Sequence, residues 1–280
     1  MRLLKKILKL SQNELAELII RIAQENNFNI IDKSPYYIIV NYTEKEIPAL
    51  NAHLDIIGDE IPKKLIEDCN IIKTNGILGG DDRCGVYIML ELIQRKIKDY
   101  MYIFFFDEEI GCIGSNKFNE KINPTCFVGL DRCGFNDIAL YGYDNDELTK
   151  TFTNIGYEIK QGSITDVAVL AQKYGIACVN LSVGFFNEHT TSEFINLKAV
   201  EFTLDTVLNK NIIHKITTHK FKVDCFLTYS PYYDYYYDEY NNYDNSLICD
   251  WCGKETIDLY DCDQWLLCEH CYYIYLEFNK

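Results

Sequence analysis

Residues that can bind metal ions occur in five short segments of this 280-residue chain. They are His53, Asp81, Glu109, Asp131 and His189. Two imidazoles and three carboxylates suit zinc, with manganese or cobalt as alternatives. One carboxylate can bridge two ions, each of which then has one histidine, one further carboxylate and an open position for water. The set therefore predicts a catalytic site with two metal ions.

Two further acidic residues adjoin this set. Asp55 lies two residues after His53, so in an extended chain both side chains point the same way and Asp55 can orient the imidazole. Glu108 directly precedes Glu109 and is not needed as a ligand, which makes it a natural general base. Glu108 is therefore free to take a proton from a water at the open metal position.

Each segment alone also has an ordinary structural explanation. Asp81 or Asp82 can cap the helix that follows them. The acidic run 107–109 can be a solvated turn, and an isolated histidine is more often structural than catalytic. The combination of the segments, rather than any one of them, favours a metal site.

Strands and helices alternate over the first 210 residues. Apolar runs predict strands at 36–42, 47–51, 100–106, 125–130 and 176–183. Helical spacing predicts helices at 15–22, 82–93, 166–174 and 197–208. This alternation indicates a layered α/β domain, and the ligands follow strand ends, where open α/β sheets place their sites. The first helix is expected to face the core, although Lys5, Lys6 and Lys9 leave a membrane-surface helix as an alternative.

The order H-x-D, G-x-D-D-x-x-G, D-E-E-x-G, a strand-end Asp and a late His resembles the co-catalytic zinc exopeptidases. These include peptidase T-like tripeptidases, zinc aminopeptidases and related deacylases. The resemblance covers residues 1–210 and implies a three-layer αβα domain with a mixed, mostly parallel central sheet.

The resemblance also implies a role for each residue. Asp81 would bridge two zinc ions, with His53 and Asp131 completing one site. Glu109 and His189 would complete the other. The general base would be Glu108, and the partner of the first histidine would be Asp55.

Two features depart from the relatives. Arg83 stands where the peptidase T-like motif usually has lysine. Only 57 residues separate Asp131 from His189, which leaves no room for the lid domain that many relatives insert there.

We therefore expect an aminopeptidase that binds the free α-amine of short peptides. The alternatives are a deacylase or amidohydrolase acting on N-acyl amino acids or small amides, and a non-catalytic scaffold that recruits a protein partner.

Two C-x-x-C pairs, fifteen residues apart, follow near the end of the chain. The spacing predicts a structural zinc ribbon, with Cys262 or His270 as substitute ligands for its four cysteines, Cys249, Cys252, Cys268 and Cys271. The ribbon could bind a protein partner or pack on the catalytic domain.

The predicted organisation has three parts. Residues 1–222 form the catalytic domain, 223–246 a linker or arm rich in tyrosine and aspartate, and 247–280 the ribbon. The arm is either a spacer or a segment that narrows the substrate cleft.

The composition excludes several classes of protein. The net charge is −15, and residues 229–280 hold eleven acidic and two basic residues, so we expect no nucleic-acid partner. The longest apolar run is too short to span a membrane, and the N-terminus lacks the features of a secretory signal. Twelve cysteines without an export signal indicate a reducing, cytoplasmic location.

Overall fold

The computed structural model describes residues 1–58, 61–62, 64–162 and 165–223, together with the backbone of four short strands between residues 247 and 267. The chain divides into two compact units, Met1–Thr228 and Tyr229–Lys280. The predicted domain boundaries at residues 222 and 246 stay predictions.

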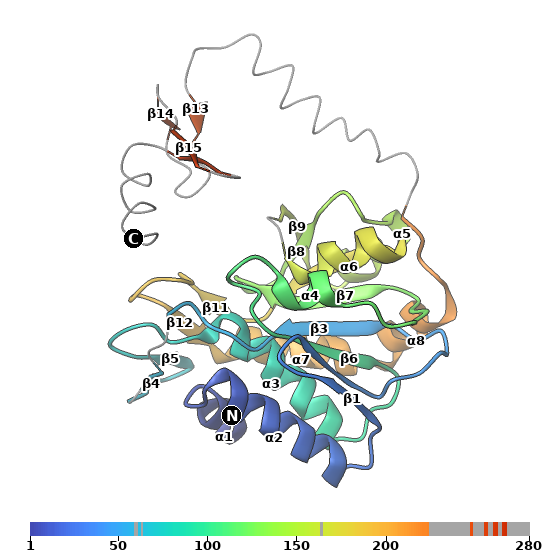
Figure 1. The fold of residues 1–280 in the computed structure, drawn as a ribbon, viewed down its shortest axis with the longest axis horizontal. Helices are drawn as coiled ribbons and strands as arrows, with labels where there is room; N and C mark the ends of the chain where they lie inside the picture. Colours follow the sequence, from blue (N-terminus) through green and yellow to red (C-terminus); the bar gives the residue numbers. More distant parts are fainter. Residues whose placement is uncertain are drawn as a thin grey trace. The chain divides into compact units, whose positions relative to one another are not determined.

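An eight-stranded sheet forms the centre of the first unit (Figure 1). Its parallel centre consists of β6, β3, β7 and β10, and antiparallel pairs join β1 to β2, β2 to β6 and β10 to β8. The strands in spatial order are β1 (Ile30–Lys33), β2 (Tyr37–Val40), β6 (Met101–Phe105), β3 (Ala49–His53), β7 (Phe127–Arg132), β10 (Cys178–Ser182), β8 (Asp137–Leu140) and β9 (Glu158–Gln161).

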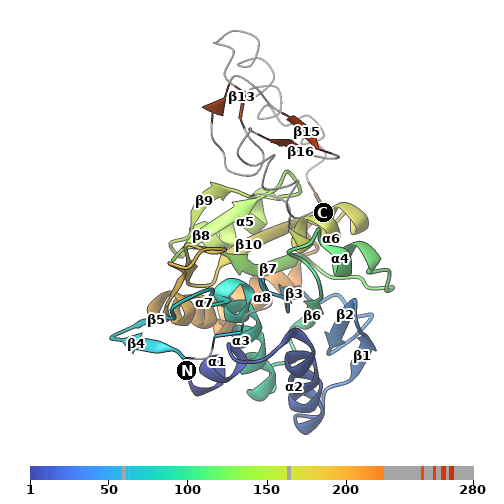
Figure 2. The ribbon, with the colours of Figure 1, turned by 60° about the vertical axis from the view of Figure 1, so that its left-hand side comes forward.

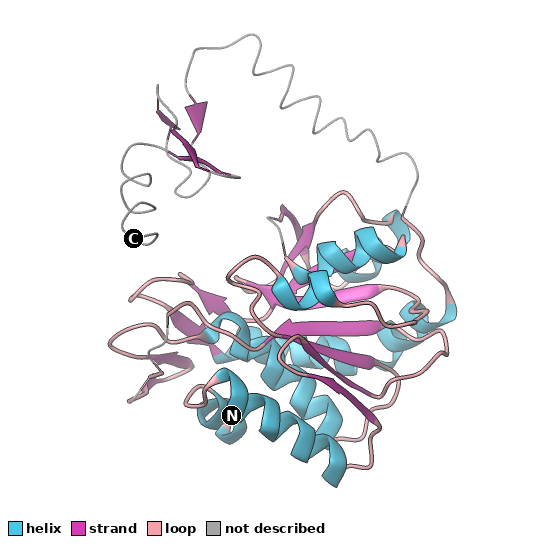
Figure 3. Ribbon diagram, in the orientation of Figure 1, coloured by secondary structure: helices cyan, strands magenta, loops and turns pink. Residues whose placement is uncertain are grey.

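Helices cover both faces of this sheet (Figure 3). One face packs against α1, α2, α3 and α7, and the other against α4 and α6. The prediction of a three-layer α/β domain with a mixed, mostly parallel sheet is confirmed. The helices are α1 (Arg2–Ile7), α2 (Gln12–Glu25), α3 (Gly80–Gln94), α4 (Ile113–Lys117), α5 (Asp146–Thr153), α6 (Asp166–Tyr174), α7 (Leu197–Leu208) and α8 (Lys210–Thr218).

Strand β6 shows why the sheet is buried on both sides. Its five residues are all buried, as the uninterrupted apolar run predicts. Tyr102 and Phe104 pack in the core on one face, whereas Ile103 and Phe105 pack in the core on the other. Successive side chains of a strand point to opposite faces, so an apolar run supplies both cores at once.

The N-terminal helices belong to the larger core. Ser11 and Glu14 form a capping box that starts α2. The predicted apolar stripe is buried against the sheet and α3, and consists of Leu15, Leu18, Ile19 and Ile22. The stripe therefore faces the core and not a lipid surface. Among the described residues, no helix has the length and apolar character to cross a membrane.

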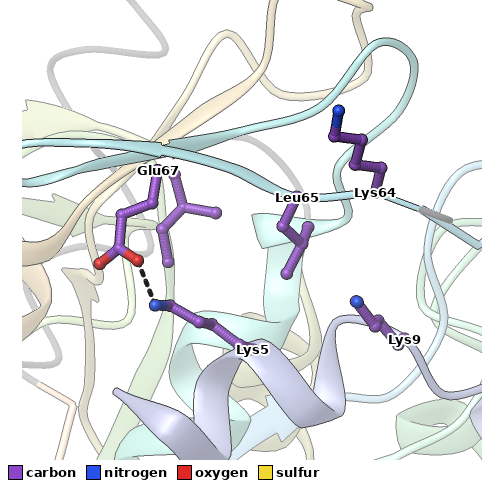
Figure 4. Close-up of a pocket in the computed structure, with 6 residues that line it drawn as sticks. Lys5, Lys9, Lys64, Leu65 and Glu67 are labelled. Carbon is purple, nitrogen blue, oxygen red and sulfur yellow. Dashed lines mark hydrogen bonds and ion pairs between the residues drawn. The ribbon is translucent and has the colours of Figure 1, made fainter.

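A second, antiparallel sheet of four short strands lies beside α1 (Figure 2). Its strands in spatial order are β11 (Phe185–Phe186), β12 (Phe194–Asn196), β5 (Ile71–Lys73) and β4 (Ile66–Asp68). Lys5 of α1 forms an ion pair with Glu67 of β4 (Figure 4). An open pocket of about 270 Å³ between these elements is lined by Lys5, Lys9, Lys64, Leu65, Glu67 and Ile72.

The second unit contains two antiparallel strand pairs. β13 (Leu247–Ile248) pairs with β14 (Glu255–Thr256), and β15 (Tyr260–Cys262) pairs with β16 (Trp265–Leu267). The four cysteines of the predicted zinc ribbon lie outside the described residues, as does the tyrosine-rich arm.

Candidate metal centre

The fold brings the predicted ligands together at one edge of the central sheet. His53 is the last residue of β3, and Asp131 lies near the end of β7. Glu109 lies in the turn after β6, and His189 lies in the loop between β11 and β12. Asp81 is at the start of α3, which packs against β3 and β7. Parallel strands end at the same edge of a sheet, which explains why residues far apart in sequence meet here.

Asp81 lies between the two histidines. Its Oδ1 is 3.1 Å from Nε2 of His53, and its Oδ2 is 3.1 Å from Nε2 of His189. His53 Nε2 also lies 3.4 Å from Oδ1 of Asp131, and His189 Nε2 lies 2.9 Å from Oε1 of Glu109. The result is two groups of three ligands that share one carboxylate. In each group, the ligand atoms lie within 4.8 Å of one another.

Asp55 connects the first histidine to the acidic turn. Its Oδ1 lies 3.3 Å from Nδ1 of His53. Its two carboxylate oxygens accept hydrogen bonds from the backbone N–H groups of Glu108 (3.0 Å) and Glu109 (2.9 Å). Asp55 therefore holds the backbone of the turn that carries the predicted base, and its carboxylate lies beside the imidazole. Glu108, His53 and Glu109 form a third group of potential ligands with atoms within 4.8 Å.

Asp82, the neighbour of the shared carboxylate, has a structural position. Its Oδ1 accepts a hydrogen bond from the N–H of Gly85 at 3.0 Å, as an N-terminal helix cap does. Its Oδ2 accepts from the backbone N–H of His53 at 3.3 Å. Asp81 and Asp82 both have non-helical dihedral angles, so the regular part of α3 begins after them. The helix-capping contact is therefore made by Asp82, whereas the carboxylate of Asp81 faces the two histidines.

Two residues that hold Asp131 were not predicted from the sequence. The Thr165 hydroxyl donates a hydrogen bond to Asp131 Oδ2 at 2.7 Å. The Asn180 side chain accepts from the backbone N–H of Asp131 at 3.0 Å and donates to its carbonyl at 3.2 Å. The one sequence signal was Asn180 itself, an amide inside an apolar strand. A buried amide in such a run needs partners, and here the partner is the backbone of a candidate ligand.

Burial and mutual repulsion perturb the ionisation of these groups. Burial raises the pKa of Glu108 to about 9, with His53 opposing the shift and Asp131 adding to it. Burial likewise raises the pKa of Asp131 to about 6. Hydrogen bonds to Asp81 and Glu109 raise the pKa of His189 to about 10. Burial opposes protonation of His53, which is 1% exposed, but the surrounding carboxylates raise its pKa above the usual value.

These pKa shifts arise because several carboxylates are buried close together, and their negative charges must be offset by positive charge. Without a metal ion, protons on the histidines and carboxylates supply that charge. A divalent cation supplies it more directly, because metal ligands bind in their deprotonated forms. The donor set, its burial and the two groups that share Asp81 therefore fit two divalent cations.

Comparisons with known proteins agree with this geometry. One family model matches residues 71–152, which include Asp81 and Glu109. That family is the M42 glutamyl aminopeptidases. The match covers less than a third of the chain. A search of curated protein sequences finds no match.

Several of the solved structures that share this fold are aminopeptidases. The aminopeptidase PepT of Bacillus cereus is 15% identical, with a TM-score of 0.64 over 77% of this chain and 97% of that chain. An aminopeptidase of the archaeon Desulfurococcus kamchatkensis is 13% identical, with a TM-score of 0.61 over 78% and 97%. PhTET1, a dodecamer in its crystal, is 16% identical, with a TM-score of 0.55 over 78% and 98%. The first unit thus has the fold of the zinc aminopeptidases, as the resemblance implied.

Proposed function

We propose that this protein is a metal-dependent aminopeptidase that hydrolyses short peptides. The observation that carries the proposal is the position of Asp81, which presents one carboxylate oxygen to each of two histidines. Two ligand groups joined in this way provide for two ions side by side. The partial match to the M42 aminopeptidases and the fold shared with aminopeptidases support the same reaction class.

Each ion has its own ligands under this proposal. Asp81 is shared, His53 and Asp131 complete one group, and Glu109 and His189 complete the other. Two zinc ions, or manganese or cobalt, would polarise the scissile carbonyl and acidify water at the site. We propose a third, structural zinc on the four cysteines of the C-terminal module.

Glu108 moves the proton in this reaction. With cations bound, whose charge favours the ionised carboxylate over the protonated form that burial alone favours, it would accept the proton of the attacking water and later donate it to the leaving amine, since the amine must be protonated to depart. Asp55 keeps Glu108 in place through the backbone of the turn and keeps the His53 ring oriented. The buried thiol of Cys112 donates to Oε1 of Glu108, with Sγ and Oε1 3.6 Å apart.

The decisive experiment compares wild type with Glu108→Gln, which keeps the size of the side chain and removes its basicity. We expect kcat to fall about 10²- to 10⁴-fold, the usual contribution of a general base. Metal content, measured by mass spectrometry, should stay at the wild-type level because the ligands are untouched. Full activity in the folded variant would show that Glu108 is not the base.

A substrate panel separates an aminopeptidase from a deacylase. Dipeptides and tripeptides with a free N-terminus are compared with the same peptides carrying an N-acetyl group, at equal zinc concentration. We expect hydrolysis of the free peptides alone. Preferential hydrolysis of the acylated compounds would replace the proposal with an amidohydrolase.

A further inference from the structure

Glu193 is a buried carboxylate that the reaction above does not use. It lies four residues after His189, directly before β12, and is 1% exposed. An ionised carboxylate is costly to bury unless hydrogen bonds satisfy its oxygens. The partners of Glu193 therefore indicate what it does.

Four consecutive backbone N–H groups donate to this one carboxylate. Oε2 accepts from Leu78 at 3.0 Å and from Gly79 at 2.9 Å. Oε1 accepts from Gly80 at 2.6 Å and from Asp81 at 3.2 Å. Converging N–H groups of this kind form an anion-binding nest, and here the anion belongs to the protein itself. All the acceptor capacity of Glu193 is used on the segment that ends at the shared ligand.

The two glycines of this segment allow the close approach. Gly79 has a φ of +70°, in the left-handed region that glycine adopts without strain. A Cβ on Gly80 would lie 3.0 Å from Oε1 of Glu193 and 2.9 Å from side-chain atoms of Ile195 and Phe185. A larger residue at position 80 would therefore push the segment away from the carboxylate.

Glu193 is also joined to the loop that carries His189. Its backbone N–H donates to the carbonyl of Thr190 at 3.2 Å. The His189 side chain is 42% exposed, and residues 190–192 are exposed as well. Glu193 is the buried end of this exposed loop. One residue therefore links the backbone before Asp81 to the backbone after His189.

We propose that Glu193 is a positioning residue that sets the distance between Asp81 and His189. It would thereby build the ligand group formed by Asp81, Glu109 and His189. This inference rests on the proposed two-metal site. A purely structural Glu193 would stabilise the fold without changing how tightly the folded protein binds metal, so metal affinity separates the two roles.

The test is calorimetric titration of metal-free, full-length protein with zinc. Glu193→Gln keeps the shape of the side chain, but its single amide oxygen cannot serve all four donors. We expect the dissociation constant of the site formed by Asp81, Glu109 and His189 to rise roughly 10- to 100-fold, the usual effect of removing a residue that orients metal ligands. Circular dichroism of each variant establishes that the titrated protein is folded.

Tyr100→Phe is the matched control. It deletes a buried hydrogen bond from the Tyr100 hydroxyl to the carbonyl of Val207, 3.0 Å long, near the end of the sheet opposite the ligands. We expect this variant to lose stability and keep wild-type zinc affinity. Gly80→Ala is the second test variant, because it displaces the segment and leaves the Glu193 charge in place. It should weaken zinc binding as Glu193→Gln does, and it decides the question if Glu193→Gln does not fold.

The outcomes distinguish the two proposals. Wild-type zinc affinity in folded Glu193→Gln would overturn the positioning role and leave the proposed function standing. Failure of the wild-type protein to bind zinc at the two-metal site would overturn the proposed function and this inference with it. Loss of affinity in both test variants, with none in Tyr100→Phe, supports the inference.

Discussion

Replacing Asp55 by asparagine tests how strongly the candidate centre depends on one carboxylate outside the two ligand groups that share Asp81. Asparagine has the same size, so the substitution leaves no cavity. Its side chain has one acceptor oxygen, whereas Asp55 uses two oxygens to accept from the N–H groups of Glu108 and Glu109. The amide NH2 group must therefore face one of these two donors.

The expected cost follows from these contacts. One hydrogen bond to a charged acceptor is lost, which is worth about 1.5–3 kcal/mol. If the transition state is destabilised by this whole free energy, kcat/KM falls roughly 10- to 150-fold at 25 °C. The fall arises because the turn that carries Glu108 moves and because His53 loses the charge beside its Nδ1. The assay is kcat/KM for a short peptide, at a zinc concentration that saturates the wild type.

Asp32→Asn is the control for this experiment. Asp32 also accepts two hydrogen bonds, from the backbone N–H and the hydroxyl of Ser34, but it is exposed and lies in β1. We expect this variant to keep wild-type kcat/KM. If folded Asp55→Asn stays within twofold of the wild type, the turn does not depend on Asp55 and the reasoning is wrong.

Two further predictions concern the shared ligand and the N-terminal helix. Asp81→Ala removes the carboxylate common to both ligand groups, so zinc content should fall by about two ions per chain; retention of both ions on mass spectrometry would refute the sharing. Ser11→Ala breaks the capping box of α2 and should lower the free energy of unfolding by about 1 kcal/mol, measured with urea, with unchanged activity at 25 °C. An equal stability of the two proteins would show that Glu14 caps the helix without Ser11.

The central strands were predictable from the sequence because they are buried on both faces. β6 is a continuous apolar run that supplies both cores, and β10 is fully buried in an apolar segment that Asn180 and Ser182 interrupt. β9 was not predicted, since all four of its residues are exposed and no apolar pattern marks them. The strand expected at 47–51 runs instead from Ala49 to His53. Its last two residues, Ala52 and His53, pair with Phe104 and Phe105 of β6. The sequence does not indicate this extension, because a polar strand end lacks the apolar pattern by which strands are predicted.

The clustering of the candidate ligands was predictable for a related reason. Histidine and acidic side chains are unusual directly after apolar strands. Because parallel strands end at the same edge of a sheet, the types of these residues and their positions in the sequence together indicated one site. Thr165 carried no such signal, because hydroxyl side chains are common in every context, and Asn180, an amide inside an apolar strand, indicated that it needs a partner but not which one. Their function depends on Asp131, which is 34 residues before Thr165 and 49 before Asn180. Such contacts exist only once the chain has folded.

The glycine pair before Asp81 is a sequence feature that the contacts of Glu193 explain. Gly79 opens the G-x-D-D-x-x-G motif, and the motif alone does not explain why the next residue, Gly80, also lacks a side chain. The structure gives a reason for each: Gly79 has a left-handed backbone, and Gly80 lies against a carboxylate. Two adjacent glycines that precede a ligand thus indicate that the backbone N–H groups at that point face an anion. Two acids lie near the late histidine in the sequence, Glu188 and Glu193, and only the fold shows that Glu193 is the buried one and links the two loops that carry the second group of candidate ligands.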